Sequence, residues 1–280
     1  MRLRTRLAIP AGRVLPDFLV IGGQRCGTSS LYKYLGQHPL VLPSLRKETE
    51  YLSRYHARGL AWYRAHFPTH LGAAMVSRAR GGRPLAFEAT PDYLWHPLSA
   101  GRAAEIVPEA RIVVLLRDPV RRAWSHHRHM TRLGFESLSF EHALDQEERR
   151  LAGERERMLA DSTYQGRSFL RYSYFSRGLY LEQLQAWLQR YPADSVLVVR
   201  SEDFYADPAR TLGHVLAFLG LPPWRPRQFR NYSSQSEEGE PAELPAGVAA
   251  MLAERYAPHN RRLARALGWE SAWDRDSSRH

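Results

Sequence analysis

Cysteine is almost absent from this sequence, which holds a single one, Cys26, in 280 residues. One cysteine excludes an internal disulfide framework and a zinc site built from cysteine ligands. A chain without disulfides fits a reducing compartment, so we expect a bacterial, cytoplasmic protein. No histidine lies near Cys26 in the sequence, and we interpret it as a small packing residue rather than a nucleophile.

Long hydrophobic runs are also missing. The N-terminal stretch is basic and then apolar, as a signal peptide is, but Pro10, Pro16 and Asp17 interrupt it. No stretch reaches the roughly 20 apolar residues that a membrane-spanning helix needs. We therefore expect neither a cleavable signal nor a membrane span.

Negative charge is in short supply, because 29 acidic residues face 40 basic ones and the formal net charge is +11. Such an excess attracts phosphates, sulfates or acidic polymers. The basic residues are spread along the chain and match no nucleic-acid-binding motif, so we expect no nucleic-acid partner, and a basic protein that binds nucleic acid or another polyanion remains an alternative. His126, His127 and His129 are not spaced to place three ligands on one helix face, so we expect helix surface there and no metal.

Strands and helices alternate along the chain. Short apolar segments predict strands at 18–21, 40–42, 85–90, 111–116 and 195–199. Apolar periodicity and charge predict helices at 27–37, 140–159, 179–191, 208–219 and 248–267, a helix that begins at Pro119, and a surface loop at 72–84. This alternation predicts a three-layer α/β fold with a central parallel sheet and flanking helices. We expect one domain over 1–280, with a lead-in at 1–16 and a binding loop or lid at 225–246.

A glycine-rich turn follows the first predicted strand, in the sequence GGQRCGTSS. Glycine permits close backbone approach, and the start of a helix binds anions, so the turn predicts a phosphate loop like that of nucleoside kinases. Gly22 and Gly27 have the separation of a nucleoside triphosphatase loop, but Thr28 stands where that motif has lysine. The cation is instead Arg25, inside the loop. A nucleotide kinase-like phosphotransferase remains an alternative at this point.

A second phosphate-binding pattern follows the strand at 111–116. Arg117 comes directly after this strand, and Ser125 lies about two turns up the next helix. Arginine binds phosphate through two parallel hydrogen bonds, and a serine hydroxyl adds a third donor. Because both patterns follow neighbouring strands, they indicate a ligand with phosphates at both ends of a nucleoside.

Together these motifs resemble those of the sulfotransferases that use 3′-phosphoadenosine 5′-phosphosulfate (PAPS), and most closely the heparan sulfate and bacterial carbohydrate-type branch. The resemblance implies that PAPS is the cosubstrate and that no metal is required. It implies that Arg25 replaces the catalytic cation of the family and that Arg117 and Ser125 hold the 3′-phosphate. It places these residues on the 5′ side: Cys26, Gly27, Thr28, Ser29 and Ser30. The segment Arg177-Gly178-Leu179-Tyr180 is similar to a family segment whose tyrosine, here Tyr180, lies near the cofactor.

The resemblance also implies a general base. In the carbohydrate branch a glutamate precedes an aromatic pair, and Lys47-Glu48-Thr49-Glu50 occupies that position here. Glu48 is therefore the expected base, and Glu50 is the alternative. The acceptor would offer a hydroxyl or an amine and could be a carbohydrate, a lipid or a small metabolite. Ala89 stands where many relatives have lysine, so the motifs do not imply a heparan-type polymer as the acceptor. The sequence identifies neither the acceptor nor the oligomeric state.

Overall fold

The computed structural model describes residue 3, residues 12–230, residue 232 and residues 243–273. Its centre is a sheet of five parallel strands in the order β2-β3-β1-β4-β5. The strands are β1 (Phe18–Gly22), β2 (Val41–Pro43), β3 (Leu85–Ala89), β4 (Arg111–Leu116) and β5 (Val196–Arg200). Each differs from its predicted range by at most one residue at either end. The predicted parallel sheet is therefore confirmed.

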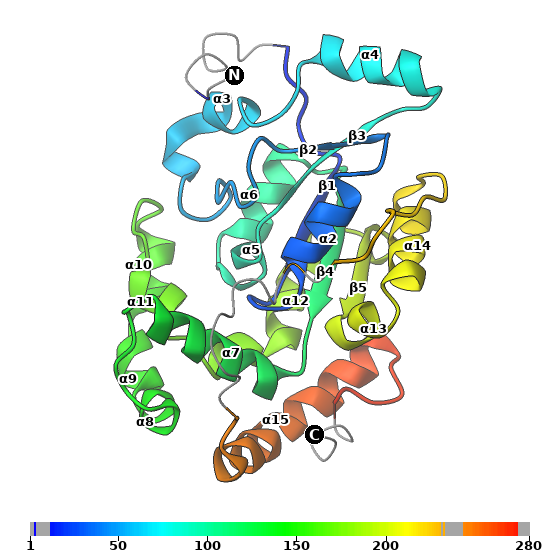
Figure 1. Cartoon of the computed structure of the whole chain (residues 1–280). Helices are drawn as coiled ribbons and strands as arrows, with labels where there is room; N and C mark the ends of the chain where they lie inside the picture. The colour runs from blue at the N-terminus through cyan, green and yellow to red at the C-terminus, as the bar shows by residue number, and fades with distance from the viewer. Residues whose placement is uncertain (1–2, 4–11, 231, 233–242, 274–280) are drawn as a thin grey trace.

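Helices cover both faces of this sheet (Figure 1). One face packs against α2 (Thr28–Leu35), α13 (Ser201–Ala206) and α14 (Pro208–Leu219). The other packs against α5 (Asp92–Trp95), α6 (Ser99–Ile106) and α12 (Tyr180–Leu188). This arrangement is the predicted three-layer α/β fold.

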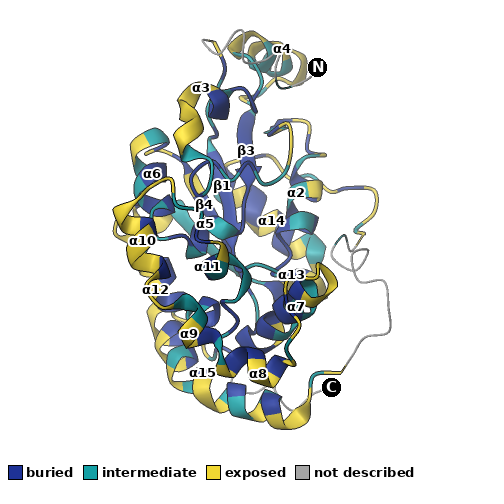
Figure 2. Cartoon of the chain, turned by 90° about the vertical axis from the view of Figure 1, so that its left-hand side faces the viewer, coloured by how far each residue is buried: buried dark blue, intermediate teal, exposed yellow. Residues whose placement is uncertain are grey.

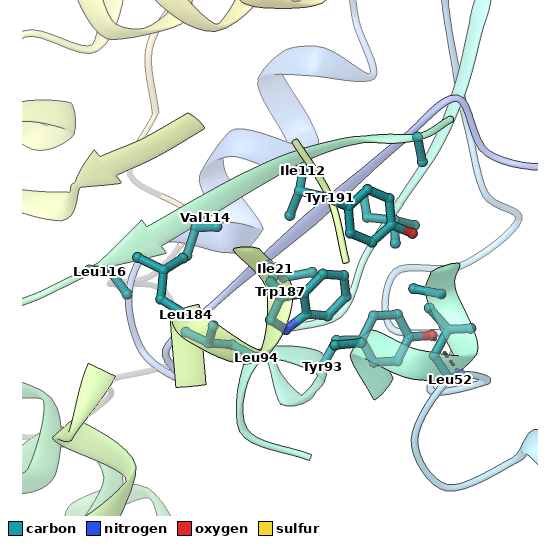
Figure 3. Close-up of a cluster of buried hydrophobic side chains, with 14 of the residues drawn as sticks. Ile21, Leu52, Tyr93, Leu94, Ile112, Val114, Leu116, Leu184, Trp187 and Tyr191 are labelled. Atoms are coloured by element: carbon teal, nitrogen blue, oxygen red, sulfur yellow. Dashed lines mark hydrogen bonds between the residues drawn. The ribbon is translucent and has the colours of Figure 1, made fainter. Parts of the chain in front are cut away.

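Strand β4 shows why the sequence reveals this sheet so clearly. Successive side chains of a strand point to opposite faces, so Val113 and Leu115 join one core while Ile112 and Val114 join the other. Figure 3 shows Ile112 and Val114 on the side that holds Trp187 of α12. Because both faces are buried, the strand is apolar at almost every position, and Figure 2 shows the sheet as the buried centre of the molecule.

Helix α7 (Pro119–Arg132) begins where the sequence predicts it. The Asp118 carboxylate accepts a hydrogen bond from the amide of Val120 at 2.9 Å, and Pro119 is the first helical residue. Both features stabilise helix N-termini.

Helix α15 (Ala246–Leu267) packs against α7 and α12 and continues through Pro258. The remaining helices are α3 (Gly59–Arg64), α4 (His70–Arg80), α8 (Phe140–Asp145), α9 (Glu147–Leu151), α10 (Glu154–Ala160) and α11 (Arg167–Arg171), with 3₁₀ turns η1 (His56–Arg58), η2 (Ser176–Gly178) and η3 (Ala193–Ser195).

Two of the sequence predictions about helices are wrong. The segment 140–159 is not one helix but contains α8, α9 and most of α10, because Gly153 adopts the left-handed conformation (φ 71°) between α9 and α10. The segment 72–84 is largely helical, as α4, rather than a loop. The Thr69 hydroxyl accepts a hydrogen bond from the amide of Gly72 at 3.0 Å, and Gly81 ends the helix with φ 70°. These end signals and the alanines between them favour a helix although its face is largely exposed.

The interpretation of the α7 histidines as helix surface is also wrong for two of the three. His126 is fully buried and His127 is 6% exposed, because this side of α7 packs into a cluster with Tyr174. Burial lowers the pKa of both imidazoles. None of the described helices combines the length and the apolarity needed to cross a bilayer.

Candidate active site

The carboxyl ends of β1 and β4 lie side by side at the centre of the sheet. Gly22 pairs in register with Leu115, and the amide of Gly23 donates to the Leu115 carbonyl oxygen at 2.9 Å. The chain runs from β1 to the β2 and β3 side of the sheet and later crosses to β4 and β5 on the other side. Open α/β sheets bind ligands at the carboxyl ends of their strands, at such a change of direction.

The glycine loop (residues 22–27) packs closely against its neighbours at each of its three glycines. A Cβ atom on Gly22, which has φ 150°, would lie 2.3 Å from the Leu115 carbonyl oxygen. Gly27 has φ 94° and caps α2, and a Cβ atom there would lie 2.9 Å from the Tyr205 hydroxyl. Arg25 is also left-handed, with φ 72°. A tight turn that leads into a helix N-terminus is the backbone arrangement with which proteins bind phosphate groups.

The two predicted phosphate-binding patterns form one connected site. Arg25 Nε donates to the hydroxyl of Ser125 on α7 at 3.0 Å. Arg117 Nη1 donates to the backbone oxygen of Arg25 at 3.2 Å, and the Tyr180 hydroxyl donates to the backbone oxygen of Arg117 at 2.8 Å. The loop after β1, the loop after β4 and α7 therefore hold one another in place.

A cleft of about 1030 Å³ opens at this edge of the sheet. Among the residues predicted for the site, the following line it: Arg25, Gly27, Thr28, Ser29, Glu48 and Arg117. Glu48 is far from Ala89 in the sequence yet lies beside the end of β3, because its amide donates to the Ala89 carbonyl oxygen at 3.0 Å. The structure thus brings the predicted base and the predicted phosphate-binding cations to one cavity.

Three predicted residues support the wall of the cleft from behind. The Cys26 carbonyl oxygen accepts a hydrogen bond from the Ser201 hydroxyl at 2.7 Å, and burial raises the pKa of the Cys26 thiol to about 11. The Ser30 hydroxyl accepts a hydrogen bond from the amide of Tyr232 at 3.2 Å, and Tyr180 is 2% exposed. The Ser30 and Tyr180 hydroxyls therefore bind backbone groups around the cleft, and the Cys26 thiol, with this pKa, stays protonated at neutral pH.

The two candidate bases differ in their surroundings. The Glu48 side chain is 42% exposed and forms an ion pair with Lys47. The Glu50 side chain is 17% exposed, and one of its carboxylate oxygens lies 3.2 Å from Arg54 Nη1. Burial raises the pKa of Glu50, which Arg54 opposes and the negative charge of Asp92 reinforces. Glu48 is therefore the more accessible of the two acids.

Sequence reasoning missed much of the lining of the cleft. It contains further cations at Arg54, Arg121, Arg167 and Arg171, and an apolar group at Met130, Leu133, Phe135 and Leu170. The spacing of four between Arg167 and Arg171, which places both on one face of α11, was the available signal. The Arg171 guanidinium lies 3.7 Å from the centre of the Phe135 ring.

The C-terminal segment also reaches the cleft. Glu202 accepts a hydrogen bond from the amide of Asp118 and another from Trp273 Nε1, each at 2.9 Å. Trp273 and Glu202 both line the cleft, as does Tyr232 from the predicted binding loop. Half of that loop, residues 231 and 233–242, lies outside the described residues, and so does most of the lead-in at 1–16. Within the described ranges, no three histidine, cysteine, aspartate or glutamate residues are grouped to hold a metal ion.

A glycine loop and an arginine at neighbouring ends of a parallel sheet indicate an α/β protein that binds phosphorylated ligands. The model of the sulfotransferase domain family matches residues 15–238, and the chain belongs to this family. The match confirms the resemblance to PAPS-dependent sulfotransferases and favours it over a nucleotide kinase or a polyanion binder.

Known relatives cover nearly the whole chain. Human heparan sulfate glucosamine 3-O-sulfotransferase 6 is 26% identical over 291 residues, which cover 94% of this chain and 75% of the relative. Human bifunctional heparan sulfate N-deacetylase/N-sulfotransferase 2 is 27% identical over 226 residues, which cover 78% of this chain and 23% of the relative. The crystal structure of a sulfotransferase from Alicyclobacillus acidocaldarius superposes with a TM-score of 0.65 at 28% identity, and covers 94% of this chain and 99% of that one. The chain is therefore a PAPS-dependent sulfotransferase.

Proposed function

We propose that this sulfotransferase transfers the sulfuryl group of PAPS to a hydroxyl or amino group of a carbohydrate, with Glu48 as the base and Arg25 at the leaving oxygen. The observation that carries the proposal is the single cleft that Arg25, Arg117 and Glu48 share. The relatives named for 3-O-sulfation and N-sulfation of heparan sulfate support a carbohydrate acceptor and both kinds of acceptor atom.

The cleft fits a ligand with two separated phosphate groups. Gly27, Thr28 and the first turn of α2 provide backbone and hydroxyl donors for the 5′ end. Arg117, with Ser125 beside Arg25, provides donors for the 3′-phosphate. Arginine is suited to this role because its planar guanidinium keeps its charge and can bind two oxygens of one phosphate.

In the proposed reaction, Glu48 acts on the acceptor and Arg25 acts on the leaving group. The acceptor oxygen or nitrogen forms a bond to sulfur while the bond between sulfur and the 5′-phosphate oxygen breaks, and the proton of the acceptor passes to Glu48. Negative charge then builds on the leaving 5′-phosphate. A fixed cation at this point, Arg25, stabilises that charge more in the transition state than in the ground state. As in phosphoryl transfer, positioning and electrostatic stabilisation supply most of the rate.

The lining of the cleft suggests what the carbohydrate carries. Arg54, Arg167 and Arg171 add positive charge to the cleft, and acidic sugars bearing carboxylate or sulfate groups complement it. Leu133 and Phe135, which are 48% and 42% exposed, provide an apolar wall against which the faces of sugar rings pack. We further propose a cytoplasmic location, because the only cysteine is buried in the glycine loop and unpaired.

The proposal is tested by incubating the enzyme with sulfur-labelled PAPS and matched panels of acidic and neutral oligosaccharides. We expect labelled product with at least one acidic acceptor, and a loss of about 10²- to 10⁴-fold in kcat for Glu48→Gln. Glu50→Gln is the matched control, since it makes the same change in the same loop, and we expect a smaller loss. A larger loss in Glu50→Gln would assign the base to Glu50, and transfer to neutral acceptors alone would reject the acidic acceptor.

A further inference from the structure

A buried carboxylate lies behind the loop that carries Glu48. Glu88, on β3, is fully buried, and its hydrogen-bond partners are four hydroxyl groups rather than a cation. Oε2 accepts from Thr49 at 2.5 Å and from Thr90 at 2.9 Å. Oε1 accepts from Tyr93 at 3.0 Å and from Tyr63. Burying a carboxylate is costly unless its oxygens are satisfied, so a strand residue of this kind needs a reason to be there.

Two of these hydroxyls connect Glu88 to the backbone of the base loop (residues 47–52). The Tyr93 hydroxyl donates to Glu88 and accepts from the amide of Leu52 at 3.2 Å, a contact that Figure 3 shows. The Thr49 hydroxyl donates to Glu88 and accepts from the amide of Tyr51 at 3.4 Å. Each hydroxyl therefore joins a loop amide to the same buried carboxylate.

The conformation of the base loop shows what this connection holds. Glu48 and Glu50 both have positive φ angles, 61° and 54°, which residues with a side chain rarely adopt. Thr49 lies between them and is fully buried, whereas both glutamate side chains reach the cleft. Such strained residues persist only where surrounding contacts fix them. The buried Thr49 lies between the two left-handed residues and ties this part of the loop to Glu88.

We infer that Thr49 and Glu88 are positioning residues that hold Glu48 in its place in the cleft. The inference rests on the proposed role of Glu48 as the base. Neither residue lines the cleft, so neither contacts the substrates, and both act through the backbone of the base loop. A base must lie within hydrogen-bond reach of the proton that it removes, and a displacement of about 1 Å can cost a factor of about 10² in rate.

The test replaces the Thr49 hydroxyl with a methyl group of the same size. For Thr49→Val we expect a loss of about 10- to 100-fold in kcat, with the dissociation constant for 3′-phosphoadenosine 5′-phosphate within about twofold of wild type. Thr49→Ser, which keeps the hydroxyl, should recover kcat to within a few-fold. Thr90→Val is the matched control, because it removes another hydroxyl from the same carboxylate oxygen but touches no loop amide, and it should retain kcat within a few-fold.

Combining the change with Glu48→Gln separates this inference from the proposed function. If Thr49 acts through Glu48, Thr49→Val should cause no further loss in the Glu48→Gln enzyme, because the two effects are not independent. An equal loss in both backgrounds, or wild-type kcat in Thr49→Val, would overturn the inference. Full activity of Glu48→Gln alone would instead reject the proposed base. If Thr49→Val does not fold, Tyr93→Phe removes the parallel link to Leu52 and carries the same expectations.

Discussion

Arg25 and Ser125 are 100 residues apart in the chain, yet Arg25 Nε donates to the Ser125 hydroxyl at 3.0 Å. The first belongs to the glycine loop after β1 and the second to α7 after β4. The contact means that the groups proposed for the two phosphates of PAPS are not separate sites. A change at one is therefore expected to alter the geometry of the other.

The first prediction concerns the charge and the shape of Arg25. Arg25→Ala should reduce kcat by about 10²- to 10³-fold, because it removes the cation at the leaving oxygen. Arg25→Lys keeps the charge, but an ammonium group cannot bind Ser125 and PAPS at the same time as a planar guanidinium can. We therefore expect an intermediate loss in kcat. Single-turnover rates with saturating PAPS measure both effects. Wild-type rates in Arg25→Ala would show that the loop cation takes no part in the chemistry.

The second prediction separates binding from chemistry at Ser125. Ser125→Ala should weaken the binding of 3′-phosphoadenosine 5′-phosphate by about 10-fold or more, since a hydrogen bond to a charged group contributes about 1.5–3 kcal/mol. Thr131→Ala is the control, because Thr131 lies on the same helix and its hydroxyl donates to the His127 carbonyl oxygen instead. Calorimetry measures both dissociation constants. Equal affinities in the two variants would remove Ser125 from the binding site.

Local sequence signals account for most of the fold. The strand at 111–116 is apolar because both of its faces are buried, and α7 begins at Pro119 because Asp118 caps it. The break between α9 and α10 depends on one glycine, Gly153, within a highly charged segment. The helix at 70–80 depends on its end residues, Thr69 and Gly81, around a segment of small residues. The periodicity of apolar residues therefore predicts neither. The burial of His126 depends on Tyr174, which lies beyond α11 in the chain and which no local pattern connects to α7.

The candidate site divides in the same way. Arg25 and Arg117 follow buried strands, so local sequence alone selects them as candidates, whereas Glu48 is selected only by its place in a motif of the family. Glu202 and Trp273 are brought to the cleft by contacts between segments 71 residues apart. In the sequence, nothing distinguishes Glu88 from its neighbours in the predicted strand. Only the fold brings four hydroxyl groups to its carboxylate. The position of Tyr180 near the cofactor stays a prediction, and its hydroxyl supports the backbone of Arg117.

The third prediction concerns the stability of the enzyme in acid. Burial lowers the pKa of His96 to about 3, with the positive charges of Arg102 and Arg177 acting in the same direction. In the unfolded chain His96 takes up a proton near pH 6.5, whereas in the folded chain it stays neutral until about pH 3. The contribution of His96 to the free energy of unfolding is therefore fully present above pH 6.5 and is lost as the pH falls toward 3. Between pH 7 and pH 5 this one group should lower the free energy of unfolding by about 2 kcal/mol.

His96→Asn tests that expectation. Asparagine keeps an acceptor for the amide of Leu98, which lies 3.3 Å from His96 Nδ1, but cannot titrate. Urea unfolding at pH 7 and pH 5 should show a decrease that is smaller by about 2 kcal/mol than in the wild type. An identical decrease in both proteins would mean that His96 does not contribute to acid sensitivity.

The last prediction concerns the backbone that forms the glycine loop. In Gly22→Ala the new Cβ atom would meet the Leu115 carbonyl oxygen at 2.3 Å and the Leu115 amide nitrogen at 2.8 Å, so β1 and β4 must separate. We expect a loss of about 2–4 kcal/mol in stability, together with loss of PAPS binding.

Gly213→Ala is the control, since a Cβ atom there, within α14, meets nothing within 4 Å. Alanine should instead stabilise that helix by up to about 1 kcal/mol. Chemical unfolding of both variants measures the contrast, and a Gly22→Ala enzyme with wild-type stability and binding would show that the two strands need not approach as closely as they do.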